Sequence, residues 1–389
     1  MNILLKKVFS LPILFGLLAC SQVSAVPIED FQDGRAAWQD KLDRLRSGGE
    51  VKFRILQLGD SHTGGDYFTQ ELRSRLQTRW GNGGIGWVSP AAVRGQRTAE
   101  VKQKGSGWQV LSSRKDEADF PLGGVLMRSQ GYASMSIIPN TEDNGAQEIT
   151  FNLRPVFVSQ PLLLADSENG MRLPVDRGEG FGWRRHTVSA KLPFSFETGG
   201  DDDIWEIGPI NIENERPGVI VSALGINGSQ LSHWSRWRPD FWQDLQTAQA
   251  DLVVLAYGTN EAFNRTIDVE ETREIWRQTV RNIKKMLPSA GILLVGAPES
   301  LTTKNGECGQ RPAKLGEIQA MQQQIAREEH LLYWSWQDAM GGECSMKNWV
   351  LQGLGAKDGV HFSATGYRLA GGKLADALME MMGDKSWFW

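Results

Sequence analysis

The sequence predicts an α/β fold: an α/β/α sandwich with a mostly parallel sheet, carrying an inserted β-rich sandwich domain. Continuous apolar segments at 53–58, 219–224 and 252–257 are typical of strands buried on both faces. Amphipathic helical patterns alternate with these segments, as expected when helices cover both faces of a sheet. Between 84 and 217 no helical pattern occurs, and short strand-like segments replace it.

The alternation of strands and helices begins with the segment 53–58. Phe68, Leu72 and Leu76 recur every fourth residue after it and predict one buried helix face. Further strands are expected at 292–295 and 331–336, and further helices at 231–245, 276–287, 315–325 and 367–381. This order favours a parallel sheet built from two separated parts of the chain.

The long span between the first two α/β strands is too long to be a loop in a compact domain. It contains strand-like segments at 133–138, 149–158 and 185–196, separated by Gly, Pro and Asp. We therefore expect residues 26–83 to form the first part of the α/β domain, 84–217 the inserted domain, which we expect to be a sandwich, and 218–389 the second part.

The first 25 residues have the pattern of an export leader. Lys6 and Lys7 precede an apolar run at 8–19, and Val23-Ser24-Ala25 is a small-residue cleavage site. The run is too short to span a bilayer, so no transmembrane helix is expected in the mature protein. Leu17-Leu18-Ala19-Cys20 resembles a bacterial lipobox, so two readings stay open: a lipid anchor on Cys20 at the outer membrane, or simple cleavage after Ala25. Both predict a periplasmic protein.

Composition excludes several classes of protein. A hydrophobic content of 40% and a charged content of 23% are typical of soluble globular domains. The formal net charge of −4 gives no reason to expect a nucleic-acid partner. In an oxidising compartment the even pair Cys308 and Cys344 favours a disulfide over free thiols, and without suitably spaced histidines it does not predict a zinc site.

Two short motifs far apart in the chain carry the residue types of a catalytic triad. Ser61 follows the first strand in a Gly-Asp-Ser turn, and Asp358 and His361 lie three positions apart before the last helix. A serine hydroxyl needs an imidazole to take its proton and a carboxylate to orient that imidazole. His62 is a second candidate base, but neighbouring side chains on a turn usually diverge. Asp60 is expected to hold the turn.

Two further polar motifs follow the next strands. Gly228 ends the string Gly-Ile-Asn-Gly after the second strand, and Asn260 lies in Gly-Thr-Asn after the third. The carboxyl ends of parallel strands share one edge of a sheet, so these motifs should converge with Ser61. The backbone N–H groups of Ser61 and Gly228 and the amide of Asn260 are three candidate donors to the oxyanion of an acyl transfer. No metal or cofactor is required.

Gly-Asp-Ser61, Gly228, Gly-Thr-Asn260 and Asp358-x-x-His361, in this order, resemble the four sequence blocks of the SGNH (GDSL-type) hydrolases. The resemblance covers the two α/β segments. It implies that Ser61 is the nucleophile, His361 the base and Asp358 its orienting residue, with Ser61, Gly228 and Asn260 forming the oxyanion hole.

The leader, the β-rich insert and the string from Gly59 to Asp66 resemble one branch, the bacterial peptidoglycan O-acetylesterases, whose insert resembles a carbohydrate-binding module. This resemblance implies a serine esterase that removes acetyl groups from the 6-hydroxyl of muramic acid in cell-wall glycan. Two alternatives stay open. One is a polysaccharide O-acetyltransferase with the same triad, and the other is a non-catalytic glycan-binding protein.

Overall fold

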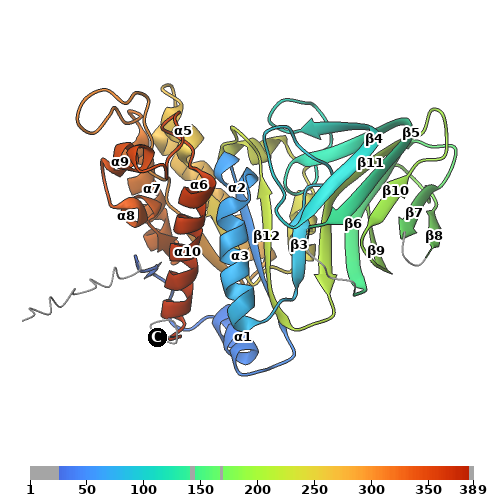
Figure 1. The fold of residues 1–389 in the computed structure, drawn as a ribbon, viewed down its shortest axis with the longest axis horizontal. Helices are drawn as coiled ribbons and strands as arrows, with labels where there is room; N and C mark the ends of the chain where they lie inside the picture. Colours follow the sequence, from blue (N-terminus) through green and yellow to red (C-terminus); the bar gives the residue numbers. More distant parts are fainter. Residues whose placement is uncertain (1–25, 141–144, 167–169, 385–389) are drawn as a thin grey trace, which may run out of the picture.

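The computed structural model describes residues 26–140, 145–166 and 170–384, and contains two separate sheets (Figure 1). The predicted leader, with both readings of its processing, lies outside the described residues. No helix within the described ranges is long and apolar enough to cross a membrane.

The first sheet has the strand order β1-β15-β14-β13-β2-β12. Every neighbouring pair is parallel except β1 with β15. Its strands are β1 (Glu29–Asp30), β2 (Lys52–Gly59), β12 (Gly218–Gly225), β13 (Leu252–Ala256), β14 (Gly291–Val295) and β15 (Leu332–Trp334). The apolar segments of the sequence predicted all of these strands except β1, although β15 is shorter than the segment 331–336 because a helix begins at Trp336.

Helices cover both faces of this sheet, so the predicted fold class is confirmed. On one face lie α1 (Ala37–Arg46), α3 (Tyr67–Trp80), α8 (Trp336–Met340), α9 (Ser345–Leu351) and α10 (Ala364–Met381), with α3 and α10 side by side in Figure 1. On the other lie the 3-10 helix η1 (Leu231–Arg236), α4 (Phe241–Thr247), α6 (Val269–Met286) and α7 (Leu315–Glu328). Two short helices, α2 (Ser61–Gly64) and α5 (Thr259–Phe263), begin just beyond strand ends.

The prediction of a single helix at 231–245 was wrong. The segment forms η1 and α4 instead, with extended backbone at Trp237 between them. Pro239 explains the break, because a proline disfavours helical backbone at the residue before it. The aromatic side chains nevertheless pack as expected, since Trp234, Trp237 and Phe241 are buried in the core beneath this face.

The second sheet has nine strands, all paired antiparallel, and forms the expected inserted β-rich domain. They are β3 (Gly84–Val88), β4 (Val101–Ser112), β5 (Val125–Pro139), β6 (Gln147–Phe157), β7 (Leu162–Asp166), β8 (Met171–Val175), β9 (Arg184–Ala190), β10 (Phe194–Glu197) and β11 (Ile204–Asn214). The sheet folds over on itself, so that Phe151 of β6 lies against Phe196 of β10 with ring centroids 5.0 Å apart. The segment 185–196, predicted as one strand, is two strands separated around Pro193, which has no N–H for a ladder.

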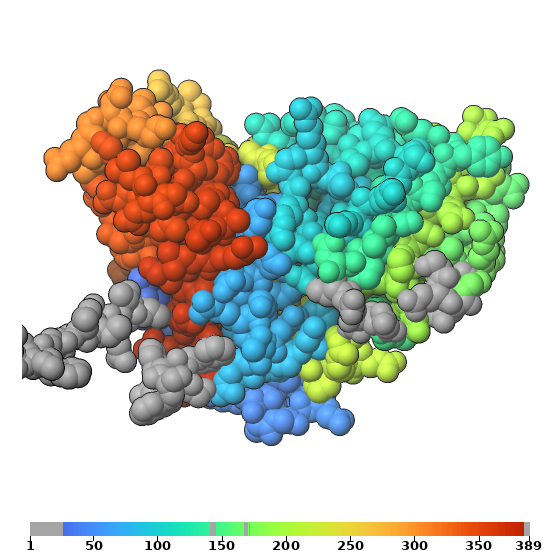
Figure 2. Space-filling model, in the orientation of Figure 1, coloured from blue at the N-terminus to red at the C-terminus, as the bar shows by residue number. Residues whose placement is uncertain are grey.

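The inserted domain packs directly on the α/β domain, in contact with it along one side in Figure 2. Trp87, Leu111 and Phe120 of the inserted segment belong to the same buried cluster as Leu56 and Leu224 of the parallel sheet. The two parts of the molecule therefore share a hydrophobic core.

Strand register brings three loops to one place at the edge of the parallel sheet. Gly59 at the end of β2 is paired with Gly225 of β12 on one side and with Ala256 of β13 on the other. The segments that follow these strands therefore leave the sheet side by side. A side chain at Gly225 would place its Cβ 2.3 Å from the backbone nitrogen of Gly64, so the close approach requires glycine.

Candidate active site

Ser61 is the first residue of α2, immediately after β2. Asp60 caps this helix, with its Oδ1 accepting a hydrogen bond of 2.9 Å from the backbone N–H of His62. No hydrogen bond within the described part of the chain uses the backbone N–H of Ser61. The turn therefore presents both a hydroxyl and a free backbone donor to the edge of the sheet.

Asp358 and His361 approach Ser61 from the loop between α9 and α10. His361 Nε2 lies 2.9 Å from Ser61 Oγ, and its Nδ1 lies 2.7 Å from Asp358 Oδ2. The other oxygen of Asp358 accepts the backbone N–H groups of Val360 and His361, each at 2.9 Å. Partial desolvation opposes ionisation, but the hydrogen bonds from His361 and from this backbone hold the pKa of Asp358 below its usual range. The chain of contacts has the order hydroxyl, imidazole, carboxylate.

Gly228 and Asn260 flank Ser61 on the turns after β12 and β13. Gly228 has φ of +75° in a turn closed by a 3.0 Å hydrogen bond from Ser229 N to Ile226 O. Its backbone N–H is not used in any hydrogen bond of the described residues. Asn260 Nδ2 lies 3.0 Å from Ser229 O and 3.3 Å from Asp60 Oδ2, which fixes the amide beside the same turn.

These residues line one open cleft of about 620 Å³. Its walls are formed by Ser61, Gly65, Tyr67, Gly95, Asn227, Gly228, Thr259, Asn260, Phe263, Val360, His361 and Tyr367. Every predicted site residue lines this cleft except Asp358, which lies behind His361 and contacts its ring. Sequence analysis missed the contributions of Tyr67 and Tyr367. The position of Tyr67 directly after the Ser61 motif was a usable signal, whereas helical spacing predicted only a packing role for Tyr367.

Two buried carboxyl groups lie behind the cleft. Desolvation raises the pKa of Asp60 to about 8, against the opposing effect of the His62 backbone N–H, and the nearby Glu261 raises it further. Desolvation also raises the pKa of Glu261 to about 7. Glu261 accepts the backbone N–H groups of Leu231 and Gly258 at 2.9 and 3.0 Å. It therefore links α5, which carries Asn260, to the segment after Gly228.

His62 is placed differently from His361. It is buried, and its Nδ1 lies 2.9 Å from the hydroxyl of Tyr367. Desolvation lowers the pKa of His62 to about 3, with a further contribution from His361. A neutral, buried imidazole packed against His361 supports the loop rather than exchanging protons with solvent.

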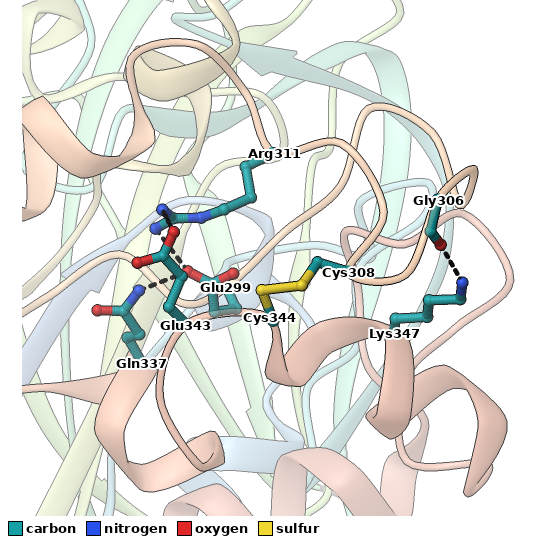
Figure 3. The surroundings of a disulfide bond; sticks show 8 residues. All are labelled: Glu299, Gly306, Cys308, Arg311, Gln337, Glu343, Cys344 and Lys347. Carbon is teal, nitrogen blue, oxygen red and sulfur yellow. Dashed lines mark hydrogen bonds and ion pairs between the residues drawn. A yellow bond between two sulfur atoms is a disulfide. The ribbon is translucent and has the colours of Figure 1, made fainter.

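Cys308 and Cys344 form a disulfide, as favoured over free thiols (Figure 3). The bond joins the loop after β14 to the start of α9. Arg311 of the same loop pairs with Glu299 and Glu343 at 2.7 and 2.8 Å, as the dashed lines in Figure 3 mark. This loop also contacts the segment of the catalytic histidine candidate, because Leu301 N donates to Gly359 O at 2.8 Å.

Comparisons with known proteins agree with the fold. Residues 83–195 match the model of the peptidoglycan O-acetylesterase N-terminal family, and residues 211–369 match the GDSL-like lipase/acylhydrolase family. The second match includes Gly228, Asn260 and His361, while Ser61 lies outside both ranges. No match was found among curated protein sequences.

Among solved structures, a peptidoglycan O-acetylesterase is 48% identical to this protein, with a TM-score of 0.85, and the match covers 92% of this chain and 99% of the other. A GDSL-like lipase from Parabacteroides merdae is 20% identical, with a TM-score of 0.34 and coverage of 43% and 74%. A family two carbohydrate esterase from Cellvibrio japonicus is 12% identical, with a TM-score of 0.32 and coverage of 73% and 99%. The last two are too distant to bear on function.

The fold and the acylhydrolase match define an SGNH (GDSL-type) carboxylic-ester hydrolase. This assignment confirms that the protein is an enzyme, as expected, and contradicts the alternative of a non-catalytic glycan-binding protein. Within the class, the chain belongs to the peptidoglycan O-acetylesterase family.

Proposed function

We propose that this protein removes O-acetyl groups from peptidoglycan, acting on the 6-hydroxyl of muramic acid residues through Ser61, His361 and Asp358. The observation that carries the proposal is the continuous contact from Ser61 Oγ to His361 Nε2 and from His361 Nδ1 to Asp358 Oδ2, at 2.9 and 2.7 Å. The similarity to a peptidoglycan O-acetylesterase over nearly the whole chain supports the substrate class.

The reaction begins when His361 Nε2 takes the proton of Ser61 Oγ as that oxygen attacks the acetyl carbonyl carbon. The carbonyl oxygen becomes an oxyanion, and Asp358 stabilises the imidazolium. Collapse of the intermediate breaks the bond to the sugar oxygen, which leaves with the proton from His361. Water then attacks acetyl-Ser61, with His361 as base, and acetate leaves while the serine regains its proton.

The backbone N–H groups of Ser61 and Gly228 and the amide of Asn260 are the proposed oxyanion donors. The two backbone N–H groups are free of other partners in the described structure. Asn260 lies on the same side of the cleft, and to reach the oxyanion its Nδ2 exchanges the longer of its two contacts, 3.3 Å to Asp60 Oδ2. The two backbone donors are preorganised, and such donors stabilise a developing oxyanion because they do not have to reorient during the reaction. Loss of one such donor typically costs about 3–4 kcal/mol of transition-state stabilisation.

Peptidoglycan lies outside the cytoplasm, which agrees with the leader that the sequence predicts at residues 1–25. We propose that the protein works in the periplasm, with either a lipid anchor on Cys20 or release after Ala25. A Cys20→Ser variant separates the two, because the anchored form would leave the membrane fraction and the released form would not change.

The test of function compares wild type with Ser61→Ala on O-acetylated peptidoglycan and on the same material after chemical de-acetylation. Wild type should release acetate only from the first, and Ser61→Ala should lower the rate by about 10⁴- to 10⁶-fold. Acetate release by Ser61→Ala at the wild-type rate would contradict the nucleophile assignment. Including a glycan acceptor distinguishes hydrolysis from the acetyltransferase alternative, since a transferase would yield acetylated acceptor instead of free acetate.

A further inference from the structure

The turn that carries Gly228 is enclosed by the inserted domain. On one side, Gln96 Nε2 donates to Gly225 O at 3.0 Å, and Asn227 Nδ2 donates to Gly95 O at 3.0 Å. On the other side, Arg114 Nε donates to Gly228 O at 2.9 Å. All three hydrogen bonds join the segment 84–217 to residues 225–228 of the α/β domain.

Arg114 is itself held in place through its backbone. Arg236 of η1 donates to the carbonyl oxygens of Arg114 and Asp116, both at 3.2 Å, and pairs with Glu117 at 2.9 Å. Beside it, Trp237 Nε1 donates to Ser113 Oγ at 3.0 Å. The loop between β4 and β5 is therefore fixed against η1, the helix that follows the turn. The guanidinium of Arg114 is exposed, but the backbone that carries it is held in place.

The direction of the Gly228 N–H depends on the peptide plane between Asn227 and Gly228. Rotating that plane changes ψ of Asn227 and φ of Gly228 together, which is the difference between the two commonest β-turn types. The side chain of Asn227 is bonded to Gly95, and the carbonyl of Gly228 is bonded to Arg114. Residues of the inserted domain therefore hold both residues that border this peptide plane.

We propose that the inserted domain completes the oxyanion hole, with Gln96 and Arg114 as positioning residues that keep the N–H of Gly228 directed into the cleft. This inference rests on the proposed function, which makes that N–H an oxyanion donor. It assigns the inserted domain a part in the chemical step itself, separate from any contact between that domain and the glycan.

The test uses the full-length protein and p-nitrophenyl acetate, an acetyl ester without a sugar. Arg114→Ala should lower kcat by about 5- to 30-fold and change KM by less than about twofold, and Gln96→Ala/Arg114→Ala should lower kcat further, within the roughly 10²- to 10³-fold expected for loss of one donor. Acylation and deacylation both pass through an oxyanion, so kcat falls whichever step is slower. Arg114→Lys, which retains a donor, should recover part of the loss.

Arg172→Ala is the matched control, because Arg172 is a 69% exposed arginine on β8 of the same domain. Its kcat should equal that of wild type. The pH profile of Arg114→Ala should keep its shape, since the contact between Ser61 and His361 is untouched. Unchanged kcat on p-nitrophenyl acetate, with a raised KM only for O-acetylated peptidoglycan, would overturn the inference and make these side chains glycan contacts. An equal loss in Arg172→Ala would overturn it too, because the effect would then be nonspecific.

The proposed function fails separately. If Ser61→Ala abolishes hydrolysis of p-nitrophenyl acetate while wild type releases no acetate from O-acetylated peptidoglycan, the substrate assignment is wrong. The comparison of Arg114 variants on the small ester still decides whether the inserted domain positions the oxyanion turn.

Discussion

At the scale of single residues, the site depends on side chains that fix one another's orientation. Asp358 accepts three hydrogen bonds, one from the His361 ring and two from its own loop. It therefore fixes both the tautomer and the direction of the imidazole that faces Ser61. Neutral His62, on the adjacent position of α2, packs against the same ring at a centroid distance of 5.4 Å.

Replacing Asp358 by Asn removes the charge and favours the wrong imidazole tautomer. We expect kcat on p-nitrophenyl acetate to fall by about 10²- to 10⁴-fold with little change in thermal stability. The loss should be similar at each pH above about 6, because the pKa of Asp358 lies below its usual range and wild type is ionised throughout. Asp202→Asn, at an exposed turn of the inserted domain, is the control. A loss below threefold would show that Asp358 does not orient the base.

Replacing Gly228 by Ala tests the oxyanion turn. An added Cβ meets only Arg114 Nε at 3.5 Å, so space is available, but φ of +75° disfavours an L residue by about 1–2 kcal/mol. We expect the turn to relax and kcat to fall by about 10- to 10³-fold. Gly180→Ala carries the same type of strain at φ of +81° in open space and should leave kcat unchanged. Equal effects of the two substitutions on kcat would count against a role for the turn.

At the scale of elements, the loops around the cleft are braced by contacts made far along the chain. The loop between β14 and α7 is joined to α9 by the disulfide and touches the segment of His361 through Leu301 and Gly359. Glu261 holds α5 to the start of η1. Each loop that carries a site residue is therefore fixed by a neighbouring element.

The Cys308→Ser/Cys344→Ser variant should unfold more readily, because a cross-link over 36 residues restricts the unfolded chain. We expect the free energy of unfolding to fall by about 2–4 kcal/mol, measured by denaturant titration. The kcat of the folded variant should stay within about threefold of wild type, since the 2.8 Å contact from Leu301 to Gly359 remains. Adding dithiothreitol should reproduce the loss in wild type and have no further effect on the variant. Equal stability of the oxidised and reduced wild type would refute this prediction.

At the scale of the whole molecule, folding buries two carboxyl groups, those of Asp60 and Glu261, behind the cleft at the edge of the parallel sheet. In the folded protein the pKa of Asp60 is about 8 and that of Glu261 about 7. In the unfolded chain these carboxyl groups have ordinary pKa values near 4. At pH values between about 4 and 7, both groups therefore stay protonated in the folded protein, whereas they are ionised in the unfolded chain. Their contribution to stability is complete below about pH 4 and is lost as pH rises through the folded-state pKa values.

The Asp60→Asn variant tests this loss of stability at high pH. Asparagine keeps an oxygen that accepts the N–H of His62, but it cannot ionise. Between about pH 5 and 9 the Tm of the variant relative to wild type should rise by roughly 3–8 °C, since only wild type must deprotonate a buried acid at position 60. Glu261→Gln should change in the same direction. A Tm difference that does not vary with pH would show that Asp60 is already ionised in the folded protein.

The sequence by itself determined the fold class and the polar motifs that converge at the cleft, but not the contributions of Tyr67 and Tyr367. Apolar runs and helical periodicity are local signals of burial, and polar motifs at strand ends converge wherever parallel strands share an edge. Local patterns did not predict the breaks near prolines, so the segments 185–196 and 231–245 were each expected to form one element and form two. The structure confirmed the cysteine pair that the sequence favoured. Only the tertiary structure decided which groups are desolvated and that Arg114 and Gln96 enclose the Gly228 turn. These features arise from contacts between segments far apart in the chain, which no periodicity records.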